Sequence, residues 1–271
     1  MKRSVGDPSR QKLKQVLFAC LREAGGVLGK SIHKIKQINY KSEANLVTRF
    51  DKMSEKMIIR RIKKTFPEHA ILAEESAPHG ISPYKWIIDP LDGTTNFAHT
   101  FPVSCVSIAV EKKGEVILGG VFDPFRNELF FGEKNAGAYL NGKQIRVSKT
   151  PRLSESLLCT GFPYDCRSYA ETYLRIFGAF MVQTHGIRRT GSAAIDICYV
   201  ACGRFDGFWE LKLNAWDTAA ASLICQEADG KMSNFKGNSY SIYEPEALAT
   251  NGCIHSEMVK ILDECYLRPK S

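Results

Sequence analysis

No apolar stretch in this sequence is long enough to cross a membrane. The longest apolar runs, residues 103–110 and 218–225, are too short for a bilayer core of roughly 30 Å. The first residues are charged or turn-forming, and no apolar segment of the kind that a secretory signal requires follows them. We therefore expect a soluble, cytoplasmic protein with no membrane partner.

The sequence also lacks a C-x-x-C motif, although it contains nine cysteines. They are odd in number and lie far apart, which is typical of reduced, mostly buried thiols and not of a disulfide framework or a zinc site. Cys198 and Cys202 could share one face of a helix as metal ligands, but the pattern favours packing in a core.

Acidic residues are fewer than basic ones. The chain has 29 Asp and Glu against 37 Lys and Arg, which gives a formal net charge of +8. A positive protein attracts anionic partners, and nucleic acid is one candidate. The basic residues are interspersed with aliphatic ones, however, as in residues 57–62, and this is typical of the solvated face of a helix. We therefore do not favour nucleic acid as a partner and expect the charge to attract a phosphate substrate.

Low-complexity tracts and internal repeats are absent too, and the 271 residues are 44% hydrophobic and 24% charged. This composition predicts a globular chain with a sizeable core and a cleft. We expect one catalytic domain over residues 1–271. A further option is a division into two subdomains, about residues 1–185 on the metal and phosphate side and about 186–271 on the substrate side.

Hydrophobic periodicity predicts helices and sheet layers that alternate around one cleft. The expected helices cover about residues 11–34, 51–66, 169–180, 192–202, 218–228 and 256–265. Short strands are expected at residues 71–73, 86–88 and 207–211 and near residues 157, 187 and 247. Residues 103–131 read as an antiparallel meander, and Asn141-Gly142 marks a tight hairpin turn. Asp51 is well placed to cap the second helix.

The densest chemical signal is the segment WIIDPLDGTTNF at residues 86–97. An apolar strand delivers Asp89 to its end, Pro90 stiffens the turn, and Asp92 follows shortly after. Gly93 permits backbone angles that other residues avoid, so the two carboxylates can converge on one point. The amides of residues 93–95 can then point the same way and form an anion site beside a cation site.

Such a segment can also be an ordinary polar turn, because Asp, Pro, Gly and Thr are all common in turns. This alternative weakens because other acids stand at the edges of apolar elements. Glu74 and Glu75 follow a strand, and Asp217 lies at the start of an Ala-rich helix. Taken singly, the acidic pair would be solvated surface and Asp217 a helix cap. Together they supply the oxygen ligands that Mg²⁺ prefers, with a substrate phosphate completing the shell.

Over nearly its whole length the sequence resembles the inositol monophosphatases, lithium-sensitive, magnesium-dependent phosphatases related to fructose-1,6-bisphosphatase. The resemblance rests above all on residues 86–97 and 216–230, and also on residues 46–51, 74–76 and 191–194. It implies an α+β fold, a layered α-β-α-β-α sandwich. It also implies hydrolysis of a small phosphorylated polyol or sugar, inhibition by lithium, and a homodimer.

By this resemblance, two or three Mg²⁺ ions would be held by acidic side chains and one carbonyl. The ligands of the first ion would be Glu74, Asp89 and the backbone carbonyl of Leu91. Those of the second would be Asp89, Asp92 and Asp217, and Glu74 would also serve a weaker third ion through water. The attacking water would be activated at these ions.

The resemblance also implies catalytic and substrate-binding residues. Thr94 and Asp51 would assist deprotonation of the water, Glu74 would take part through the metal ions, and Glu75 would support the metal shell. The residues expected at the substrate are Asp92, Gly93, Thr94, Thr95, Gly191, Ser192, Ala193 and Glu210.

The sequence departs from the family pattern at positions outside the expected metal ligands. These departures leave the identity of the substrate's alcohol open. Asn45 stands where an acid is frequent, Asn214 where a basic residue or histidine is frequent, and Ala215 where proline or cysteine is frequent. Lys41 could lie near the third ion or be solvated.

Glu210 bears on the identity of the alcohol. At a strand end it would accept hydrogen bonds from ring hydroxyls, which favours inositol 1-phosphate. The alternative is that Glu210 pairs with Lys212 at the surface. A fructose-1,6-bisphosphatase or dual-specificity sugar phosphatase stays open, as does a regulatory role in binding RNA or protein.

Overall fold

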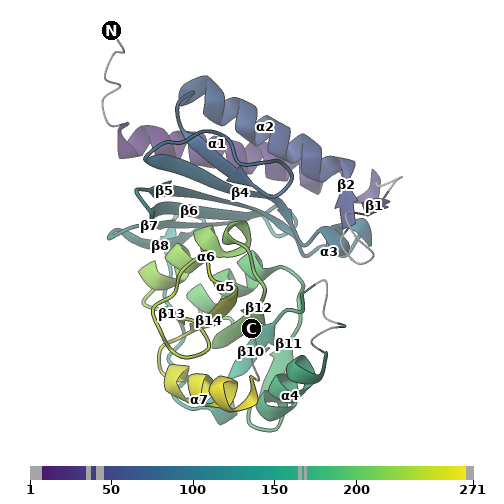
Figure 1. The fold of residues 1–271 in the computed structure, drawn as a ribbon, viewed down its shortest axis with the longest axis vertical. Helices are drawn as coiled ribbons and strands as arrows, with labels where there is room; N and C mark the ends of the chain where they lie inside the picture. The colour runs from purple at the N-terminus through teal and green to yellow at the C-terminus, as the bar shows by residue number, and fades with distance from the viewer. Residues whose placement is uncertain (1–7, 35–37, 41–45, 164–166, 168–169, 267–271) are drawn as a thin grey trace.

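The computed structural model of this protein describes residues 8–34, 38–40, 46–163, 167 and 170–266. Helices and sheets alternate along its long axis (Figure 1). The layers are, in order, α1 (Arg10–Gly29) with α2 (Arg49–Thr65), a seven-stranded sheet, α5 (Ala193–Ala201) with α6 (Ala215–Glu227), a five-stranded sheet, and α4 (Ala170–Met181) with α7 (His255–Cys265). The expected α+β fold, an α-β-α-β-α sandwich, is confirmed.

The seven-stranded sheet contains the predicted antiparallel meander. Its strands lie in chain order: β3 (Ala70–Ala73), β4 (Tyr84–Asp92), β5 (Cys105–Lys112), β6 (Glu115–Asp123), β7 (Glu128–Glu133), β8 (Gly137–Leu140) and β9 (Lys143–Gln144). β3 and β4 are parallel, and the later neighbours are antiparallel. Asn141 (φ 49°) and Gly142 (φ 80°) join β8 to β9, so the predicted hairpin turn is confirmed.

The five-stranded sheet is mixed. Its spatial order is β11 (Gly186–Arg188), β10 (Leu157–Thr160), β12 (Gly207–Leu211), β14 (Glu246–Thr250) and β13 (Lys231–Ser233). The first three are parallel, and β14 is antiparallel to β12 and β13. The sequence did not predict β13 or the antiparallel pair β1 (Ile38–Tyr40) and β2 (Leu46–Thr48), because such short segments carry little periodicity.

Several helix boundaries differ from the prediction. α1 ends at Gly29, and a separate 3-10 turn, Ile32–Lys34, follows, so the helix predicted to residue 34 is too long. α2 begins at Arg49, which places Asp51 inside the first turn with its side chain buried. Asp51 is therefore not a cap, because it lies on the apolar face of α2 that packs on the seven-stranded sheet. α6 begins at Ala215, before the predicted start at residue 218.

Glycines in the seven-stranded sheet let α6 lie close against it. A Cβ added at Gly119 would come 2.5 Å from the Ala220 carbonyl oxygen, and one at Gly132 would come 3.0 Å from the Cα of Ile224. The small residues of α6 and the bare glycines opposite them therefore allow backbone to approach backbone. This close packing brings the first turn of α6 to the end of β4.

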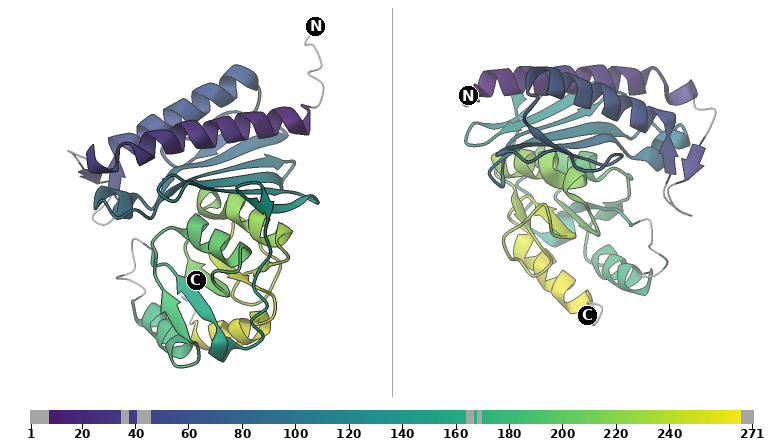
Figure 2. Two further views of the ribbon diagram at one scale, coloured as in Figure 1. Left: turned by 180° about the vertical axis from the view of Figure 1, so that it is seen from behind. Right: turned by 45° about the horizontal axis from the view of Figure 1, so that its top comes forward.

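Helices cover the seven-stranded sheet and separate it from the five-stranded sheet. Seen from behind, α1 and α2 cover the outer face of the seven-stranded sheet, while α5 and α6 lie between the two sheets (Figure 2).

Every cysteine in the described residues is free. Across the same residues, no helix is long and apolar enough to pass through a membrane. Lys41, Asn45 and Cys166 lie outside the described residues, and a subdomain division near residue 185 stays a prediction.

Candidate active site

The aspartates of β4 lie at a break in the seven-stranded sheet. Asp89 pairs with Ser107 and Asp92 with Cys105 on β5, and the register shifts between the two pairs. A β-bulge of this kind bends a strand and redirects its side chains. Asp89 Oδ1 accepts a hydrogen bond from the Leu91 N–H at 2.9 Å, which fixes the carboxylate within the bulge.

Glu74 reaches the same place from β3. Its N–H donates to the Ile88 carbonyl at 3.2 Å, which extends the parallel pairing of β3 with β4 and sets Glu74 beside Asp89. The N–H of Glu75 donates to Glu55 Oε2 at 2.8 Å. Because Glu55 is buried on α2, it fixes the turn that follows β3.

Asp217 approaches from the opposite side, in the first turn of α6. Its Oδ2 accepts the Asn214 N–H at 2.6 Å, as the acid of a capping box does. The Ser107 hydroxyl donates to the Trp216 carbonyl at 3.5 Å, which ties the start of α6 to β5 beside Asp89. Acidic side chains that follow β3, end β4 and begin α6 therefore lie close enough for their charges to interact.

Asp89 is buried, Glu74, Asp92 and Asp217 are half-buried, and the four carboxyls repel one another. Burial, followed by the charges of Glu74, Asp92 and Asp217, raises the pKa of Asp89 well above its usual value. Burial raises the pKa of Asp217 to about 8, and Asp92 and Glu74 add to the effect while the bond from Asn214 opposes it. Burial likewise raises the pKa of Asp92 to about 6, against the bonds from Ser192 and Ala194. A bound cation would relieve this repulsion.

The donor set fits a hard divalent cation such as Mg²⁺. It consists of carboxylate oxygens and the buried Leu91 carbonyl, the ligand type that Mg²⁺ takes together with water. In their present orientations, no group of three or more His, Cys, Asp or Glu side chains among the described residues could hold a metal ion. One reason is that Asp92 Oδ2 and Asp217 Oδ2 are turned toward protein donors. Each carboxylate has a second oxygen, so a cation can bind without breaking these bonds.

Asp51 and Thr94 meet next to the bulge. The Thr94 hydroxyl lies 3.0 Å from Asp51 Oδ1 and 3.0 Å from the Leu91 carbonyl oxygen. Its single proton can serve one of these acceptors at a time. Ser54, on the same face of α2 as Asp51, donates to the Pro90 carbonyl at 3.0 Å and ties the helix to the bulge. The structure thus brings together the pair predicted to move a proton.

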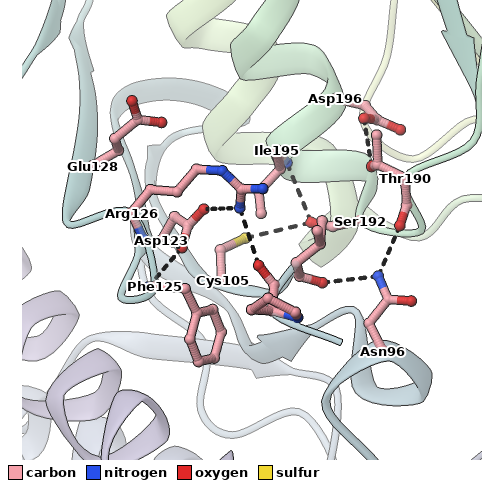
Figure 3. Close-up of polar contacts among 12 residues, drawn as sticks. Asn96, Cys105, Asp123, Phe125, Arg126, Glu128, Thr190, Ser192, Ile195 and Asp196 are labelled. Carbon is pink, nitrogen blue, oxygen red and sulfur yellow. Dashed lines mark hydrogen bonds and ion pairs between the residues drawn. The ribbon is translucent and has the colours of Figure 1, made fainter. Parts of the chain in front are cut away.

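The start of α5 holds Asp92 from the other half of the molecule. Asp92 Oδ2 accepts the Ser192 hydroxyl at 2.7 Å and the Ala194 N–H at 2.8 Å. The Cys105 thiol points at the same Ser192 hydroxyl, 3.7 Å away (Figure 3). Ala193, between these two contacts, is buried beside Asp92. Of the predicted substrate residues, Ser192 and Ala193 are therefore brought to the acidic cluster.

The glycines predicted at the substrate also lie here. Gly93 has φ 88° and precedes α3 (Thr94–Ala98), and Gly191 has φ 93° and precedes α5. A Cβ added at Gly93 would come 2.8 Å from the Val103 carbonyl oxygen and 3.3 Å from the Gly191 carbonyl oxygen. The two loops therefore approach each other because neither carries a side chain. Thr95 is exposed on α3.

Glu210 lies near the end of β12 and is 8% exposed. Its carboxyl packs over Gly161, where an added Cβ would overlap it. Burial, then the charges of Asp196, Asp217 and Asp92, raise its pKa well above the usual value. These neighbours place Glu210 on the cluster side of the sheet, and a surface pair with Lys212 does not suit a side chain this buried.

The sequence analysis missed several polar residues around the cluster. Ser54 and Glu55 follow Asp51 on one face of α2, and that helical spacing was an available signal. Asp196 accepts the Thr190 hydroxyl at 2.6 Å with Oδ1, while its buried Oδ2 has no hydrogen-bond partner among the described residues. Asp196 gave no signal in the sequence, because its acidic neighbours Asp92 and Glu210 come from other segments of the chain.

Known proteins are similar to this chain over most of its length. The model of the inositol monophosphatase family matches residues 9–268. The inositol-1-monophosphatase of Synechocystis sp. is 47% identical over 232 residues, which cover 84% of this chain and 81% of that protein. The Nus factor SuhB of Escherichia coli is 44% identical over 220 residues, 80% of this chain and 82% of that protein. A solved structure of inositol monophosphatase from Anabaena (Nostoc) sp. has a TM-score of 0.86 at 40% identity and covers 94% of this chain and 97% of that one. The chain belongs to the inositol monophosphatase family.

Proposed function

We propose that the protein hydrolyses a phosphomonoester of a small polyol with the help of Mg²⁺, and that inositol 1-phosphate is its preferred substrate. Membership of the family supports phosphatase activity. The observation that carries the finer proposal is the meeting of Glu74, Asp89 and Asp217 from three separate elements, where burial raises the pKa values of both aspartates. Such an acidic cluster would hold the cation against which a phosphate binds.

The proposed ligands of the cation are Glu74, Asp89, Asp92 and Asp217 together with the Leu91 carbonyl. A bound divalent cation would lower the pKa of a water molecule and offset the charge of the phosphate. Ser192 and Ala194 would keep Asp92 in place, because both donate to its Oδ2.

Thr94 and Asp51 would take the proton of the attacking water. When the Thr94 hydroxyl donates to Asp51 Oδ1, its oxygen is left as an acceptor for a proton from the water. Asp51 is fully buried, so bulk solvent does not compete for this position. The phosphate would lie against the amides of Gly93 and Thr94.

Glu210 would select the alcohol. A carboxyl group at this place can hydrogen-bond the hydroxyls of a polyol ring. The acidic neighbours that raise its pKa, Asp196 and Asp217 among them, outnumber the single cation Arg189 that lowers it, and would also repel a second phosphate. These charges favour inositol 1-phosphate over fructose 1,6-bisphosphate.

Hydrolysis of three esters tests the proposal. We expect the highest kcat/KM with inositol 1-phosphate, lower values with fructose 1,6-bisphosphate and glycerol 2-phosphate, and no turnover after a chelator removes Mg²⁺. Glu210→Gln should lower kcat/KM for inositol 1-phosphate by up to about tenfold, the scale of one hydrogen bond, and spare glycerol 2-phosphate.

Glu246→Gln is the matched control. Glu246 is a buried glutamate on the neighbouring strand β14, and its Oε2 accepts the Phe235 N–H at 3.1 Å. This variant should leave the ratio between the two esters unchanged. Equal losses on both esters in Glu210→Gln, or a wild-type preference for the bisphosphate, would make a sugar bisphosphatase the better assignment.

The outer surface of the molecule favours a second candidate role, in binding RNA. Among the charged side chains of α1 and α2 that the structure describes, Glu23 is the only exposed acid, whereas Lys52, Lys56 and Arg60 are examples of many exposed bases. In addition, the relative from Escherichia coli is named Nus factor SuhB and not a phosphatase. A shift of labelled RNA that weakens with salt and persists in Asp217→Asn would support this role, and no shift at low salt would exclude it.

A further inference from the structure

One side chain outside the acidic cluster joins two backbone segments that flank it. Asn96 Nδ2 donates one hydrogen bond to the Val103 carbonyl and another to the Thr190 carbonyl, each 2.8 Å long (Figure 3). Asn96 lies on α3, the helix that Thr94 begins. Thr190 lies just before Ser192, the N-cap of α5. Asn96 thus connects the proposed phosphate side of the site to its polyol side.

The bond to Val103 gives Asn96 a fixed support. The carbonyl of the preceding residue, Pro102, accepts a hydrogen bond from Arg126 Nη1 at 3.0 Å, and the same nitrogen lies 3.0 Å from Asp123 Oδ2. Asp123 ends β6, is 1% exposed and also accepts the Phe125 N–H at 2.8 Å. Residues 102–103 are therefore anchored to the seven-stranded sheet independently of Asn96.

The bond to Thr190 reaches the other half of the molecule. The Thr190 hydroxyl donates to Asp196 Oδ1 on α5 at 2.6 Å, so Thr190 and the first turns of α5 are held as one piece. At Gly191 the chain passes directly over the Asn96 amide, since an added Cβ would come 2.9 Å from Nδ2. The start of α5 is thus fixed to the phosphate side by Asn96 as well as by Asp92.

We propose that Asn96 is a positioning residue that sets the spacing between the phosphate-binding and polyol-binding sides of the site. This inference rests on the proposed function. The amides of Gly93 and Thr94 would contact the phosphate, whereas Ala193 and Glu210 would contact the alcohol. A large polyol ester must meet both sides at once, while a small ester depends mainly on the phosphate side. Asn96 therefore acts on selectivity for the alcohol and not on cleavage of the phosphate ester.

The geometry explains why an amide is needed at this position. Both bonds come from one nitrogen that carries two N–H donors, and both acceptors are backbone carbonyls. An aspartate would place oxygen against oxygen, and a serine could keep one bond only.

The chain offers a matched control in Asn251. Its Nδ2 also donates to two oxygens, the Ser148 hydroxyl at 2.9 Å and the Thr150 carbonyl at 3.0 Å, and the side chain is buried. The backbone N–H of Asn251 donates to the carbonyl of Asp206, which precedes β12. Glu210 lies near the other end of that strand. Asn251→Ala therefore loses the same two donor contacts away from the site, together with the bonds that Asn251 Oδ1 accepts from the N–H groups of Cys253 and Ile254.

The experiment compares Asn96→Ala with Asn251→Ala in two readouts. In the presence of Mg²⁺, Asn96→Ala should lower kcat/KM for inositol 1-phosphate by tenfold to a hundredfold, the order of magnitude for a misplacement of about 1 Å, and change glycerol 2-phosphate by less than about threefold. Asn251→Ala should leave the ratio of the two esters unchanged. In amide hydrogen exchange without substrate, residues 190–195 should exchange faster in Asn96→Ala only. Asn96→Ser, which keeps one donor, serves both readouts if the alanine variant does not fold.

Three results would overturn the inference: equal losses on both esters, unchanged exchange over residues 190–195, or the same change of ratio in Asn251→Ala. If the wild-type protein does not hydrolyse inositol 1-phosphate, the proposed function fails. The exchange measurement still decides whether Asn96 holds the start of α5, because it needs neither substrate nor metal.

Discussion

Thr94 and Asp51 lie 43 positions apart in the chain, yet the Thr94 hydroxyl is 3.0 Å from Asp51 Oδ1. Both side chains are buried, with 3% of Thr94 and 0% of Asp51 exposed. The contact joins the first turn of α2 to the first residue of α3 and leaves the Thr94 oxygen as a proton acceptor. A pair arranged in this way can carry a proton from a water molecule to a shielded carboxylate.

Thr94→Ala and Asp51→Asn should therefore each lower kcat by roughly a hundredfold to ten-thousandfold, the usual contribution of a general acid–base group, with little change in KM. Because the two residues act as a unit, the double variant should be scarcely slower than either single one. Steady-state kinetics with inositol 1-phosphate at saturating Mg²⁺ measures this. A rise in KM alone, or fully additive losses, would argue against the pair.

Asp217→Asn should nearly abolish turnover while the protein keeps its fold. The amide oxygen of asparagine can still accept the Asn214 N–H that Asp217 Oδ2 now accepts at 2.6 Å, so the cap of α6 survives. The charge that would bind a cation is lost, which should weaken Mg²⁺ binding. Activity over a magnesium titration, read beside urea unfolding, checks both halves. Full activity at low Mg²⁺ would contradict the assignment.

Gly93 and Gly114 both have a positive φ, but only at Gly93 would an added Cβ meet neighbouring atoms. Substituting each by alanine therefore separates the effect of crowding from the effect of backbone strain. Gly93 has φ 88° and Gly114 φ 86°, but an added Cβ meets the Val103 carbonyl oxygen at 2.8 Å in the first case and nothing within 4 Å in the second. Gly114→Ala should lower the free energy of unfolding by about 1 kcal/mol, the backbone term alone, and leave activity unchanged. Gly93→Ala should lose more stability and more than about tenfold in kcat/KM, since the loops at the site must move apart. Equal effects of the two substitutions would refute the proposed close approach.

His69 should make stability depend on pH. Burial, helped by the charge of Lys63, lowers its pKa to about 4, and the Trp86 indole N–H donates to its Nδ1 at 3.0 Å, which requires the neutral ring. Because the folded pKa lies below the unfolded value of about 6.5, this contribution is complete above pH 6.5 and is lost as the pH falls toward 4. At about 1.4 kcal/mol per pKa unit, the loss is a few kcal/mol.

His69→Asn keeps an acceptor for Trp86 but cannot gain the proton, so its unfolding free energy should fall less between pH 6.5 and 4.5. Urea unfolding at several pH values measures the difference. Slope that remains in the variant comes from the buried His255, whose pKa burial also lowers to about 4, and from the carboxyls of Asp92 and Asp217, whose raised pKa values act with the opposite sign. Parallel curves for His69→Asn and the wild-type protein would rule out His69 as a source of the dependence.

The sequence by itself determined most of the helices and strands and the set of acidic residues around the end of β4. The strand that carries Asp89, the turn at Gly93 and the hairpin at Gly142 were predictable, because hydrophobic runs and the backbone freedom of glycine are properties of a few consecutive residues. The expected strand end at Asp89 was wrong, since β4 runs on through Pro90 to Asp92. The acidic residues could be recognised as a set for the same reason, since each follows or begins an apolar element. Their roles rested on resemblance to the family.

Only the tertiary structure decided which distant side chains meet. Asp51 looked like a helix cap in the sequence, and burial of its helix face against the sheet turned it toward Thr94 instead. Asp92 bonds Ser192 across 100 positions, and Asn96 bonds Thr190 across 94. Local propensity carries no information about such pairs, because their distance depends on how closely the layers pack. That packing is set by α6 lying against bare glycines, a fit that no single segment of the chain specifies.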